Sequence, residues 1–477
     1  MSLTFSCDDA RLQSALQRAL TGLRANVRPV HGSDRPVLIE GAEYRGIWLE
    51  CGLHEASIYG MVDPQVAIDS HRIFFRLQHE DGYLPCWIRE DRAGTAQIQM
   101  VVPIAATALE TYRQAKYRPF MREAYEACVR WDGWLTRYRD TRGTGLCEAF
   151  CEYDTGHDNS PRFHGLPKAC PDGDARKCSP VGGLPYVAPD LSATLYGGRG
   201  ALAEMAHLLG LPEAEAWKRK AEETQRALLA MLFDPESDAF FDLDKDDRWV
   251  RIRGDAITRV LGEHVVDQPL FERIYRRHLR NEQAFWTPYP LASIAANDPA
   301  FVRPIPHNSW GGASQALTAL RAPRWFEHYG KWADLTHLMS RWVEALARAD
   351  GFRQQIDPWT GEFTPGDGGY SPAMLVLLDF MTRMWGVRRV GETFEWGLLP
   401  LNGSFSCGEA EVRHEGDVSE LFVEGRLTAR IEGACRMVTD SRGRPLRVIG
   451  ASSGLAEVRI NEGVPTTVAP DETVALV

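Results

Sequence analysis

Thirteen consecutive positions, Cys151 to Phe163, hold an unusual number of side chains that could do chemistry. The stretch CEYDTGHDNSPRF includes Asp154 and Asp158, and an amide, a hydroxyl and a guanidinium follow Asp158 within four residues. Carboxyl groups act as proton donors or acceptors when their surroundings tune their pKa. Asp-Asn-Ser-Pro also favours a tight turn, so the alternative is that this segment only caps the turn before Pro161.

A second polar stretch, PHNSWGG (Pro306 to Gly312), precedes a predicted helix. Backbone amides at the helix start and the side chains of His307, Asn308 and Trp310 can converge there on hydroxyl groups. The alternative is an ordinary helix start with Asn308 or Ser309 as its cap.

The sequence is rich in tryptophan, with 14 Trp and 10% aromatic residues. Tryptophan packs in cores and also stacks on flat apolar ligand faces, including sugar rings. Trp48, Trp87, Trp286 and Trp359 lie in long connecting segments rather than on helical faces. We expect them to line a pocket, with packing inside the loops as the alternative.

The sequence predicts neither a metal nor another cofactor. His54 and His307 could be metal ligands, but no third His or Cys stands at ligand spacing. The run DLDKDD (Asp242 to Asp247) lacks the glycine and the glutamate of a calcium-binding loop, so we interpret it as a solvated turn.

Bulk properties argue against several classes of protein. The net charge is −11 and the pI is about 5.7, and no Lys/Arg block stands out, so we expect no nucleic-acid partner.

No apolar run approaches the roughly 18 residues of a membrane span, and the N-terminus lacks a basic start followed by an apolar core. We therefore expect no membrane partner, a cytoplasmic location and free thiols. The close cysteine pairs, Cys147/Cys151 and Cys170/Cys178, do not have zinc-site spacing.

Helices must position these segments, because apolar residues follow a helical period up to about residue 388. Residues 202–209 and 217–231 carry apolar side chains three and four apart, and a short break at Gly210–Pro212 predicts an antiparallel helix pair. The segment Ser371–Trp385 is apolar on nearly every face, which predicts a helix enclosed by other helices. The sequence therefore predicts a mainly α fold, a toroid of inner and outer helices over residues 1–390. Long insertions interrupt it at 41–64, 81–96, 141–192, 282–312 and 351–370, and loops of that length are usually functional.

The pattern changes after about Val390, where apolar residues recur two apart between Gly- and Ser-rich breaks. Leu421 and Val423, and later Val458 and Ile460, are examples. This alternation predicts four to six antiparallel strands. We expect a small β-sandwich-like domain at 391–477 with a structural role, because its loops hold no cluster of catalytic residue types.

Several stretches resemble one group of enzymes. Residues 189–244 resemble the central helical hairpin of the six-hairpin glycosidases. RGIWLECGLH (Arg45 to His54) resembles a segment of glycoside hydrolase family 63, with Glu50 where that family has Asp. TGHDNSPRF and DPWTGEF resemble loops of that family and of the related family 37 trehalases and mannosylglycerate-type hydrolases. The resemblance covers roughly residues 1–390 and implies an (α/α)6 barrel that hydrolyses glycosides.

The resemblance implies that Asp158 is the general acid of an inverting reaction, in which a second carboxylate activates water. The family's base, a Glu, falls on Gln354 in RQQIDPWTG, and an amide cannot take a proton from water. Three explanations stay open. Another carboxylate serves as base, with Glu362, Asp367 and Asp357 nearest in sequence; or an anion such as phosphate is the nucleophile; or the site binds sugar without hydrolysing it.

The other candidates are expected to bind the sugar or hold the loops. Asp154 stands where the family often has Glu and could hold a sugar hydroxyl or satisfy backbone amides. Arg162 is expected to anchor its loop by pairing with a carboxylate rather than to touch sugar. The full set of expected binding residues is Arg45, Trp48, Glu50, His54, Trp87, Asp154, Asn159, Arg162, Trp286, His307, Asn308, Trp310, Gln354 and Trp359.

The sequence thus predicts an exo-acting, inverting glycosidase for a small α-linked glycoside or oligosaccharide, with carbohydrate as its partner. A sugar epimerase or lyase on the same toroid is a second hypothesis, but such epimerases use paired His on inner helices, whereas His residues here fall mostly in loops. Gln354 motivates two more hypotheses, a phosphorylase and a carbohydrate-binding protein that does not hydrolyse its ligand.

Overall fold

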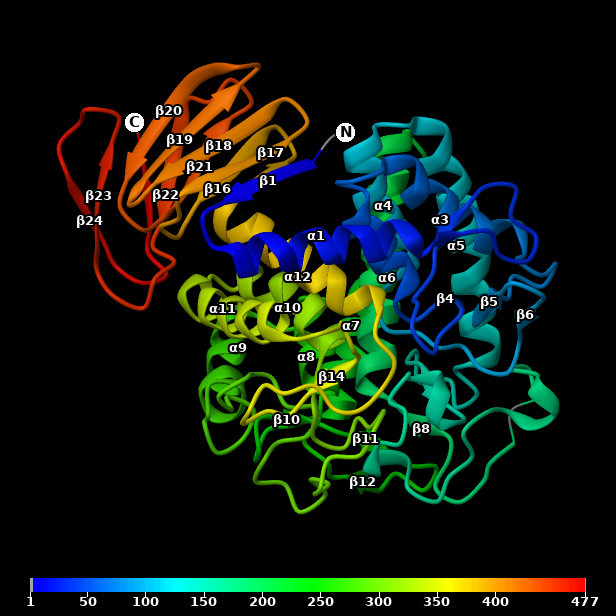
Figure 1. Ribbon diagram of the computed structural model, residues 1–477. Coiled ribbons are helices and arrows are strands. Elements are labelled where there is room, and N and C mark those ends of the chain that lie inside the picture. Colours follow the sequence, from blue (N-terminus) through cyan, green and yellow to red (C-terminus); the bar gives the residue numbers. More distant parts are fainter. Residues whose placement is uncertain (1–2, 178, 477) are drawn as a thin grey trace.

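The computed structural model describes residues 3–177 and 179–476 (Figure 1), so Cys178 lies outside the described residues. The described part is a mainly helical body joined to β-sheets. Its α-helices are α1 (Ala10–Ala25), α2 (Gly52–Tyr59), α3 (Pro64–Arg76), α4 (Ile104–Ala115), α5 (Arg118–Tyr138), α6 (Pro189–Leu209), α7 (Ala214–Leu232), α8 (Ala256–Gly262), α9 (Gln268–Ile274), α10 (Ala316–His328), α11 (Trp332–Arg348) and α12 (Ser371–Trp385). A short π-helical turn, Tyr275–Leu279, extends α9.

Side-chain caps and apolar periodicity explain where several helices begin and how they face. Asp9 accepts the backbone N–H groups of Arg11 and Leu12 at the start of α1, and Asp63 caps α3 with Pro64 in its first turn. Helix α12 has the bounds expected from sequence and is buried along nearly its whole length. Helix α7 is amphipathic, which fits its place on the outside of the body.

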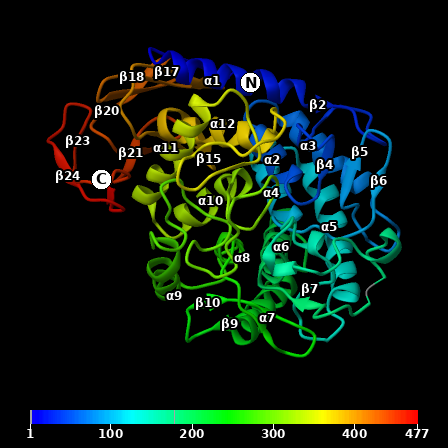
Figure 2. The same cartoon turned by 60° about the horizontal axis from the view of Figure 1, so that its bottom comes forward.

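The even-numbered helices contact one another in cyclic order. Helix α2 packs against α4, α4 against α6, α6 against α8, α8 against α10, α10 against α12, and α12 against α2. The odd-numbered helices α1, α3, α5, α7 and α11 each pack on one or more members of this ring. In Figure 2 the colours accordingly run around the body, from blue α3 through cyan α5 and green α7 to yellow-green α11. None of the helices in the described ranges is long and apolar enough to cross a membrane.

Connection lengths alternate, and this gathers the long loops at one end of the helical body. Each connection from an even-numbered helix to the next odd-numbered one is short, as at 60–63, 116–117, 210–213 and 329–331. Each connection that leads into an even-numbered helix is long: 26–51, 77–103, 139–188, 233–255, 280–315 and 349–370. Since neighbouring helices in such pairs are antiparallel, the long connections emerge on the same side, at the bottom of Figure 1.

Short strands organise these long connections. They form a three-stranded sheet of β4 (Gly46–Trp48), β5 (Trp87–Arg89) and β6 (Ala93–Gly94), and a four-stranded sheet of β7 (Glu148–Ala149), β8 (Tyr186–Val187), β11 (Asp242–Leu243) and β12 (Trp249–Val250). Two-stranded pairs join β2 (Val27–Arg28) to β3 (Val37–Leu38), β9 (Phe233–Asp234) to β10 (Ala239–Phe240), and β13 (Ser314–Gln315) to β14 (Gln355–Ile356). The sheets tie together loops that are far apart in sequence.

Two antiparallel sheets follow the last helix. One contains β15 (Val387–Val390), β16 (Thr393–Gly397), β21 (Arg436–Asp440), β22 (Pro445–Ile449) and β25 (Thr473–Ala475). The other contains β1 (Leu3–Cys7), β17 (Gly403–Cys407), β18 (Ala410–Glu415), β19 (Val418–Val423), β20 (Arg426–Glu432), β23 (Ala456–Ile460) and β24 (Thr466–Val468). Buried side chains of both sheets, such as Trp396 and Leu421, belong to one apolar cluster, so the sheets pack face to face.

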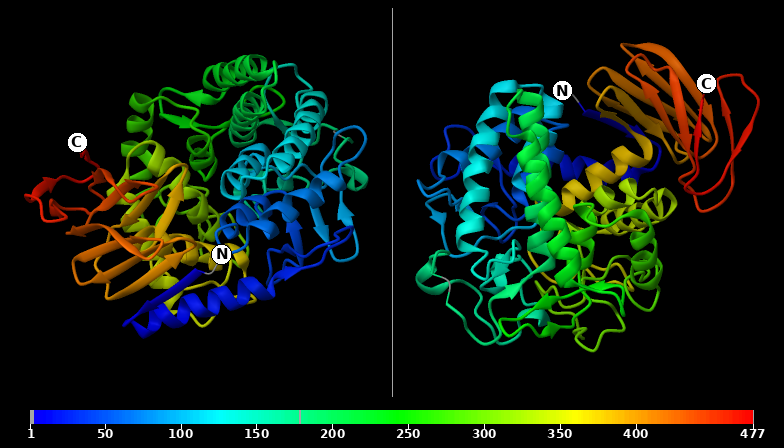
Figure 3. Two further views of the ribbon diagram at one scale, coloured as in Figure 1. Left: turned by 90° about the horizontal axis from the view of Figure 1, so that it is seen from above. Right: turned by 180° about the vertical axis from the view of Figure 1, so that it is seen from behind.

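The N-terminal strand belongs to the second sheet. Strand β1 pairs antiparallel with β17 along its whole length, and both views of Figure 3 show the blue N-terminal segment beside the orange strands. The sequence placed residues 1–390 in one domain and 391–477 in another. That division stays a prediction, and the structure adds that the first strand lies with the C-terminal strands.

Candidate active site

A line of hydrogen bonds joins four of the long connections, 26–51, 139–188, 280–315 and 349–370. The Tyr44 hydroxyl donates to Gln354 Oε1 at 2.8 Å, Gln354 Nε2 donates to Asn308 Oδ1 at 2.9 Å, and Asn308 Nδ2 donates to Asp158 Oδ2 at 3.3 Å. The backbone N–H of Trp310 donates to the carbonyl of Asp158 at 3.0 Å. The loops that the sequence singled out around Asp158, Asn308 and Gln354 therefore meet at one place.

The carboxyl group of Asp158 is partly exposed, yet protein surrounds it closely enough to disfavour its charge. Burial raises the pKa of Asp158 to about 6. The hydrogen bond from Asn308 and the positive charge of Lys168 work against this rise, and the negative charge of Glu152 adds to it. A carboxyl group with this pKa keeps part of its protons near neutral pH, as a general acid must.

Glu50 lies against the loop that carries Asp158. A Cβ atom placed on Gly156 would be 2.3 Å from the carboxyl carbon of Glu50, and Gly156 has φ +64°, so glycine is required there for two reasons. Gln99 Nε2 donates to Glu50 Oε2 at 3.0 Å. Burial and the charge of Asp158 raise the pKa of Glu50 to about 7, so the two carboxyl groups influence each other.

Two further glutamates are buried beside Glu50. Glu40 is 5% exposed and Glu55 is not exposed at all, and the carboxylate oxygens of Glu55 have no hydrogen-bond partner among the described residues. Burial raises the pKa of Glu55 to about 8, and burial with the charges of Glu55 and Glu50 raises the pKa of Glu40. Glu55 therefore favours the protonated form around neutral pH, which lets it donate a hydrogen bond.

Arg162 anchors the loop. Its Nε and Nη2 donate to Asp242 at 2.6 and 2.5 Å, and its Nη1 and Nη2 donate to Asp190 at 2.8 Å each. All three side chains are buried. Burial alone would raise the pKa of Asp190, but the charges of Arg162 and Arg259 outweigh it and lower that pKa. Arg162 thus pairs with carboxylates, as the sequence suggested.

Asp255 extends this buried charge network toward Trp310. It accepts hydrogen bonds from Arg259 Nε at 2.8 Å and from Arg321 Nη2 at 3.0 Å, and both guanidinium groups lie against the Trp310 ring. His157 connects the Arg162 ion pairs to those of Asp255. Its Nδ1 accepts a hydrogen bond from Arg162, and its Nε2 lies 3.3 Å from Asp255 Oδ2. Burial and Arg259 lower the pKa of His157 to about 3, so the ring is neutral.

A pocket opens beside the hydrogen-bonded line. Tyr44, His307, Gln354, Asp367 and Tyr370 are among the residues that line it. The exposed Asp367 is therefore on the Gln354 side of the site. Glu362, also exposed, is not among the lining residues, and its backbone N–H donates to the Thr360 hydroxyl.

The aromatic candidates fall into two groups. Trp48 and Trp87 face each other across β4 and β5, and Tyr44 contacts Trp48 edge-on at 5.7 Å. Trp48 and Trp310 share a small apolar cluster with Tyr44 and Trp87 packed against it, so these rings lie near the site.

The other two candidate tryptophans, Trp286 and Trp359, do not belong to this cluster. Trp286 stacks on His337 of α11 and lies under Arg280, so it packs against a helix. Trp359 contacts Phe301 and lies under Arg303. For Trp286 the contacts correspond to packing rather than to pocket lining.

Two other candidate binding residues, Asp154 and Asn159, already form hydrogen bonds within the protein. Asp154 accepts the backbone N–H groups of Ile98 and Phe150 at 2.8 Å each and pairs with Arg139, so it satisfies backbone amides rather than a sugar hydroxyl. Asn159 donates to the carbonyl of Asn308 at 2.7 Å.

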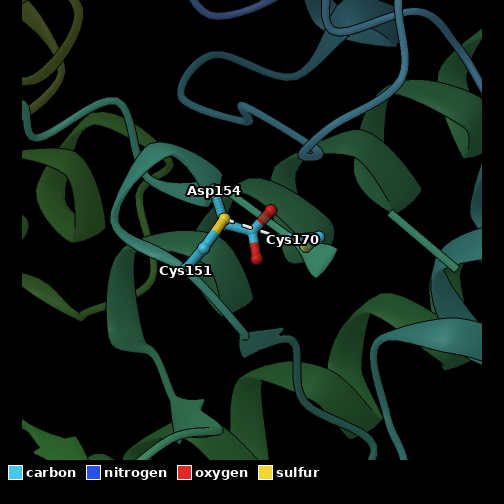
Figure 4. A group of neighbouring side chains, drawn as sticks. All are labelled: Cys151, Asp154 and Cys170. Carbon is cyan, nitrogen blue, oxygen red and sulfur yellow. Dashed lines mark hydrogen bonds between the residues drawn. The ribbon is translucent and has the colours of Figure 1, made fainter. Parts of the chain in front are cut away.

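Three more predicted binding residues, His307, His54 and Arg45, range from exposed to buried. His307 contacts the Pro365 carbonyl and Glu43. His54 is buried in α2, and Arg45 is exposed. Neither histidine belongs to the group of metal-ligand side chains found among the described residues, which is Cys151, Asp154 and Cys170 (Figure 4).

The sequence did not reveal Tyr44, Glu40, Glu55 or the Asp255 network. These residues come together only because separate connections meet, and no local motif marks them. A usable signal existed for Tyr44 alone, since it directly precedes the Arg45–His54 segment that resembles glycoside hydrolase family 63.

Comparisons with known proteins agree with this picture. Residues 44–396 match the family model described as the mannosylglycerate hydrolase MGH1-like glycoside hydrolase domain. No curated protein gives a significant sequence match.

Solved structures show the same fold at low identity. A mannosylglycerate hydrolase of glycoside hydrolase family 63 from Thermus thermophilus, in complex with glucose, is 20% identical with a TM-score of 0.64 over 77% of this chain and 100% of that chain. Neutral trehalase Nth1 from Saccharomyces cerevisiae is 15% identical with a TM-score of 0.57 over 72% of this chain and 73% of that chain. A family 78 rhamnosidase of Bacillus sp. GL1 is 12% identical with a TM-score of 0.57 over 87% of this chain and 40% of that chain.

The buried anchor predicts a contrast between two arginines. In Arg162→Lys, an ammonium group replaces the planar guanidinium group, which pairs with two carboxylates at once. One of the buried aspartates, Asp190 or Asp242, then loses its partner, so the free energy of unfolding should fall by about 3–5 kcal/mol. Arg176→Lys is the matched control, because Arg176 makes the same paired contact with Asp174 at the surface, where the loss should be about 0–1 kcal/mol. Urea unfolding measures both values. Equal losses in the two variants would contradict the anchoring role.

Proposed function

The chain belongs to the mannosylglycerate hydrolase MGH1-like glycoside hydrolase family, and we propose that it hydrolyses a small glycoside with Asp158 as the proton donor. The observation that carries this proposal is the position of the Asp158 carboxyl group, which hydrogen bonds join through Asn308 to Gln354 and whose pKa burial raises to about 6. Leaving-group protonation requires a carboxyl group that still holds a proton near neutral pH.

We assign the helical body to the (α/α)6 barrel. The cyclic contacts of the six even-numbered helices support this assignment, and so do the odd-numbered helices packed on them. The long connections all lead into even-numbered helices, so they surround one end of the ring. This arrangement explains why Asp158, Asn308 and Gln354, which are distant in sequence, share one site.

The proposed reaction needs a carboxylate on the far side of the sugar from Asp158. Asp367 meets this requirement best, because it lines the pocket together with Gln354, whereas Glu50 lies against Gly156 on the Asp158 side. We therefore propose that Asp367 accepts the proton of the attacking water and that Glu50 holds a sugar hydroxyl. Attack opposite the leaving group gives inversion at the anomeric carbon.

The substrate is proposed to be a small α-linked glycoside, cleaved from its end. The rings of Tyr44 and Tyr370 line a cavity of about 10 Å³, and Trp48 and Trp310 form an apolar cluster against which Tyr44 packs, so aromatic faces on which a sugar ring can stack lie close to one another. The Thermus thermophilus relatives were solved with glucose and with Tris and D-glycerate, so glycosides of glycerate belong in the first substrate panel.

A second candidate reaction is transfer of the sugar to an anion such as phosphate. Gln354 favours it, because the amide stands where the resemblance expects the base and is held on both sides by Tyr44 and Asn308. An anionic oxygen can attack the anomeric carbon without a base, while Asp158 still protonates the leaving oxygen. The product would be a sugar 1-phosphate.

Replacement of single carboxyl groups tests the hydrolytic mechanism. Asp158→Asn removes the proton donor and Asp367→Asn removes the proposed base, so each should lower kcat by about 10²- to 10⁴-fold on unactivated glycosides. Glu362→Gln is the matched control in the same connection as Asp367 and should keep the wild-type rate. Initial rates on the substrate panel measure the effect. A wild-type rate in Asp158→Asn would remove Asp158 from the mechanism.

The pH dependence should follow the groups around Asp158. Activity should fall as pH rises past the pKa of Asp158, because the proton needed by the leaving group is lost. Asn308→Ala removes a hydrogen bond that stabilises the charged form, so the alkaline limb should move to higher pH. Glu152→Gln removes a negative charge that favours the protonated form, so the limb should move to lower pH. Rate–pH profiles of both variants check the signs, and shifts in the same direction would contradict this account.

Phosphate separates the two candidate reactions. Hydrolysis predicts that added inorganic phosphate leaves the products unchanged and that no phosphorylated sugar forms. Phosphorus NMR of a reaction in phosphate buffer measures whether a phosphorylated sugar forms. In Gln354→Glu a carboxylate replaces the amide at the expected base position. A phosphate-dependent wild type that becomes phosphate-independent in Gln354→Glu would show that phosphorolysis is the natural reaction.

A further inference from the structure

The loop that carries Asp158 has a narrow neck at which its two ends lie side by side. The backbone N–H of Glu152 donates to the Pro167 carbonyl at 2.9 Å, and that of Tyr153 donates to the Lys168 carbonyl at 3.0 Å. Lys168 Nζ also donates to Asn159 Oδ1 at 2.8 Å, across the loop. Residues 152–168 therefore close on themselves before the chain continues.

Two thiols stand directly outside this neck. The Sγ atoms of Cys151 and Cys170 are 3.8 Å apart, and both residues are buried, with Cys151 at 0% and Cys170 at 4% exposure (Figure 4). A disulfide needs the sulfur atoms to approach to about 2.05 Å, so the two sulfur atoms must move closer by roughly 1.8 Å. We infer that Cys151 and Cys170 are an oxidation site at which a disulfide closes the neck of the Asp158 loop.

The surroundings give the two cysteines different roles. Arg139 Nη2 donates to Cys170 Sγ at 3.6 Å, and Cys170 is the more exposed of the two. Cys170 is therefore the thiol that reacts first with an oxidant small enough to enter.

A hydroperoxide is an oxidant of that size, and the reaction balances. Cys170 attacks one peroxide oxygen, which gives a sulfenic acid at Cys170 and one molecule of water or alcohol. The Cys151 sulfur then attacks the Cys170 sulfur and displaces the hydroxyl group as a second water, with the thiol proton leaving in that water. The protein loses two protons and two electrons in total. A dithiol reductant reverses the change.

A metal ion fits these side chains less well. Asp154 completes the group, but both of its oxygens already accept backbone N–H groups, and Arg139 lies 3.4 Å from one of them. A cation bound there would displace those hydrogen bonds and face a guanidinium group. The geometry therefore favours a bond between the two sulfurs.

A disulfide between Cys151 and Cys170 would restrict the motion of the segment that carries Asp158. The disulfide would join residues on either side of the two backbone hydrogen bonds, so the ends of residues 152–168 could no longer separate. The effect on catalysis rests on the proposed function, whereas the cross-link itself does not. The experiment therefore reads the cross-link and the loop motion rather than activity.

The test compares fully reduced protein with protein treated with dilute hydrogen peroxide. Peptide mass spectrometry after alkylation under denaturing conditions should find Cys151 joined to Cys170, with two fewer alkylated thiols. Hydrogen exchange in residues 152–168 should slow on oxidation and recover with dithiothreitol. Cys170→Ser should lose both responses. Cys147→Ser is the matched control, because Cys147 is also buried near the same loop, and it should keep both.

Three results would overturn the inference. One is over-oxidised Cys170 without a cross-link to Cys151. Another is a cross-link from Cys170 to any other cysteine. The third is protection of both thiols from alkylation by zinc(II) alone together with no disulfide after peroxide, which would assign the group to a metal.

Discussion

The site depends on one constraint, which is that the carboxyl group of Asp158 is poorly hydrated and accepts a hydrogen bond from a neutral donor. Burial raises its pKa to about 6, and the Asn308 amide opposes the rise only in part. Asp154, four residues earlier in the same loop, accepts two backbone N–H groups and pairs with Arg139. Similar side chains therefore serve different ends, because the protein supplies different partners to each.

The loop holds Asp158 in its poorly hydrated position because a buried network of charged side chains fixes the part of the loop that packs against the helical body. Arg162, Arg259 and Arg321 face Asp190, Asp242 and Asp255, and the neutral ring of His157 bridges them. Charges of opposite sign are thus matched away from water, where an unpaired one would cost several kcal/mol. The network places the Trp310 ring over two guanidinium groups, and the Trp310 backbone in turn holds the Asp158 carbonyl.

Much of the fold follows from local patterns. The helix at Ser371–Trp385 was predicted from its uniform apolarity, because a helix with no polar face must be enclosed. Arg162 was expected to pair with a carboxylate, and in the structure it pairs with Asp190 and Asp242, which the sequence could not name as its partners. The place of β1 was not predicted, since five residues of alternating pattern carry too little signal to name a partner strand about 400 residues away.

The site was predictable only where it is carried by loop motifs. Asp158, Asn308 and Gln354 come from such motifs, and the structure joins them in one line of hydrogen bonds. Glu40 and Glu50 join Glu55 of α2 as a buried group only because the connection 26–51 folds against Gly156 and against Ser371 at the start of α12, which no sequence period encodes. Trp286 shows the reverse case, because a tryptophan in a long connection can still pack against a helix.

Direct titration of Asp158 tests the central claim. Carbon-13 NMR of the aspartate carboxyl groups, with the Asp158 resonance assigned by its absence in Asp158→Asn, follows this one group through its titration. The account predicts an inflection near pH 6. An inflection near the ordinary aspartate pKa of about 3.9 would contradict it, because such a group would hold almost no proton to give to a departing sugar oxygen at neutral pH.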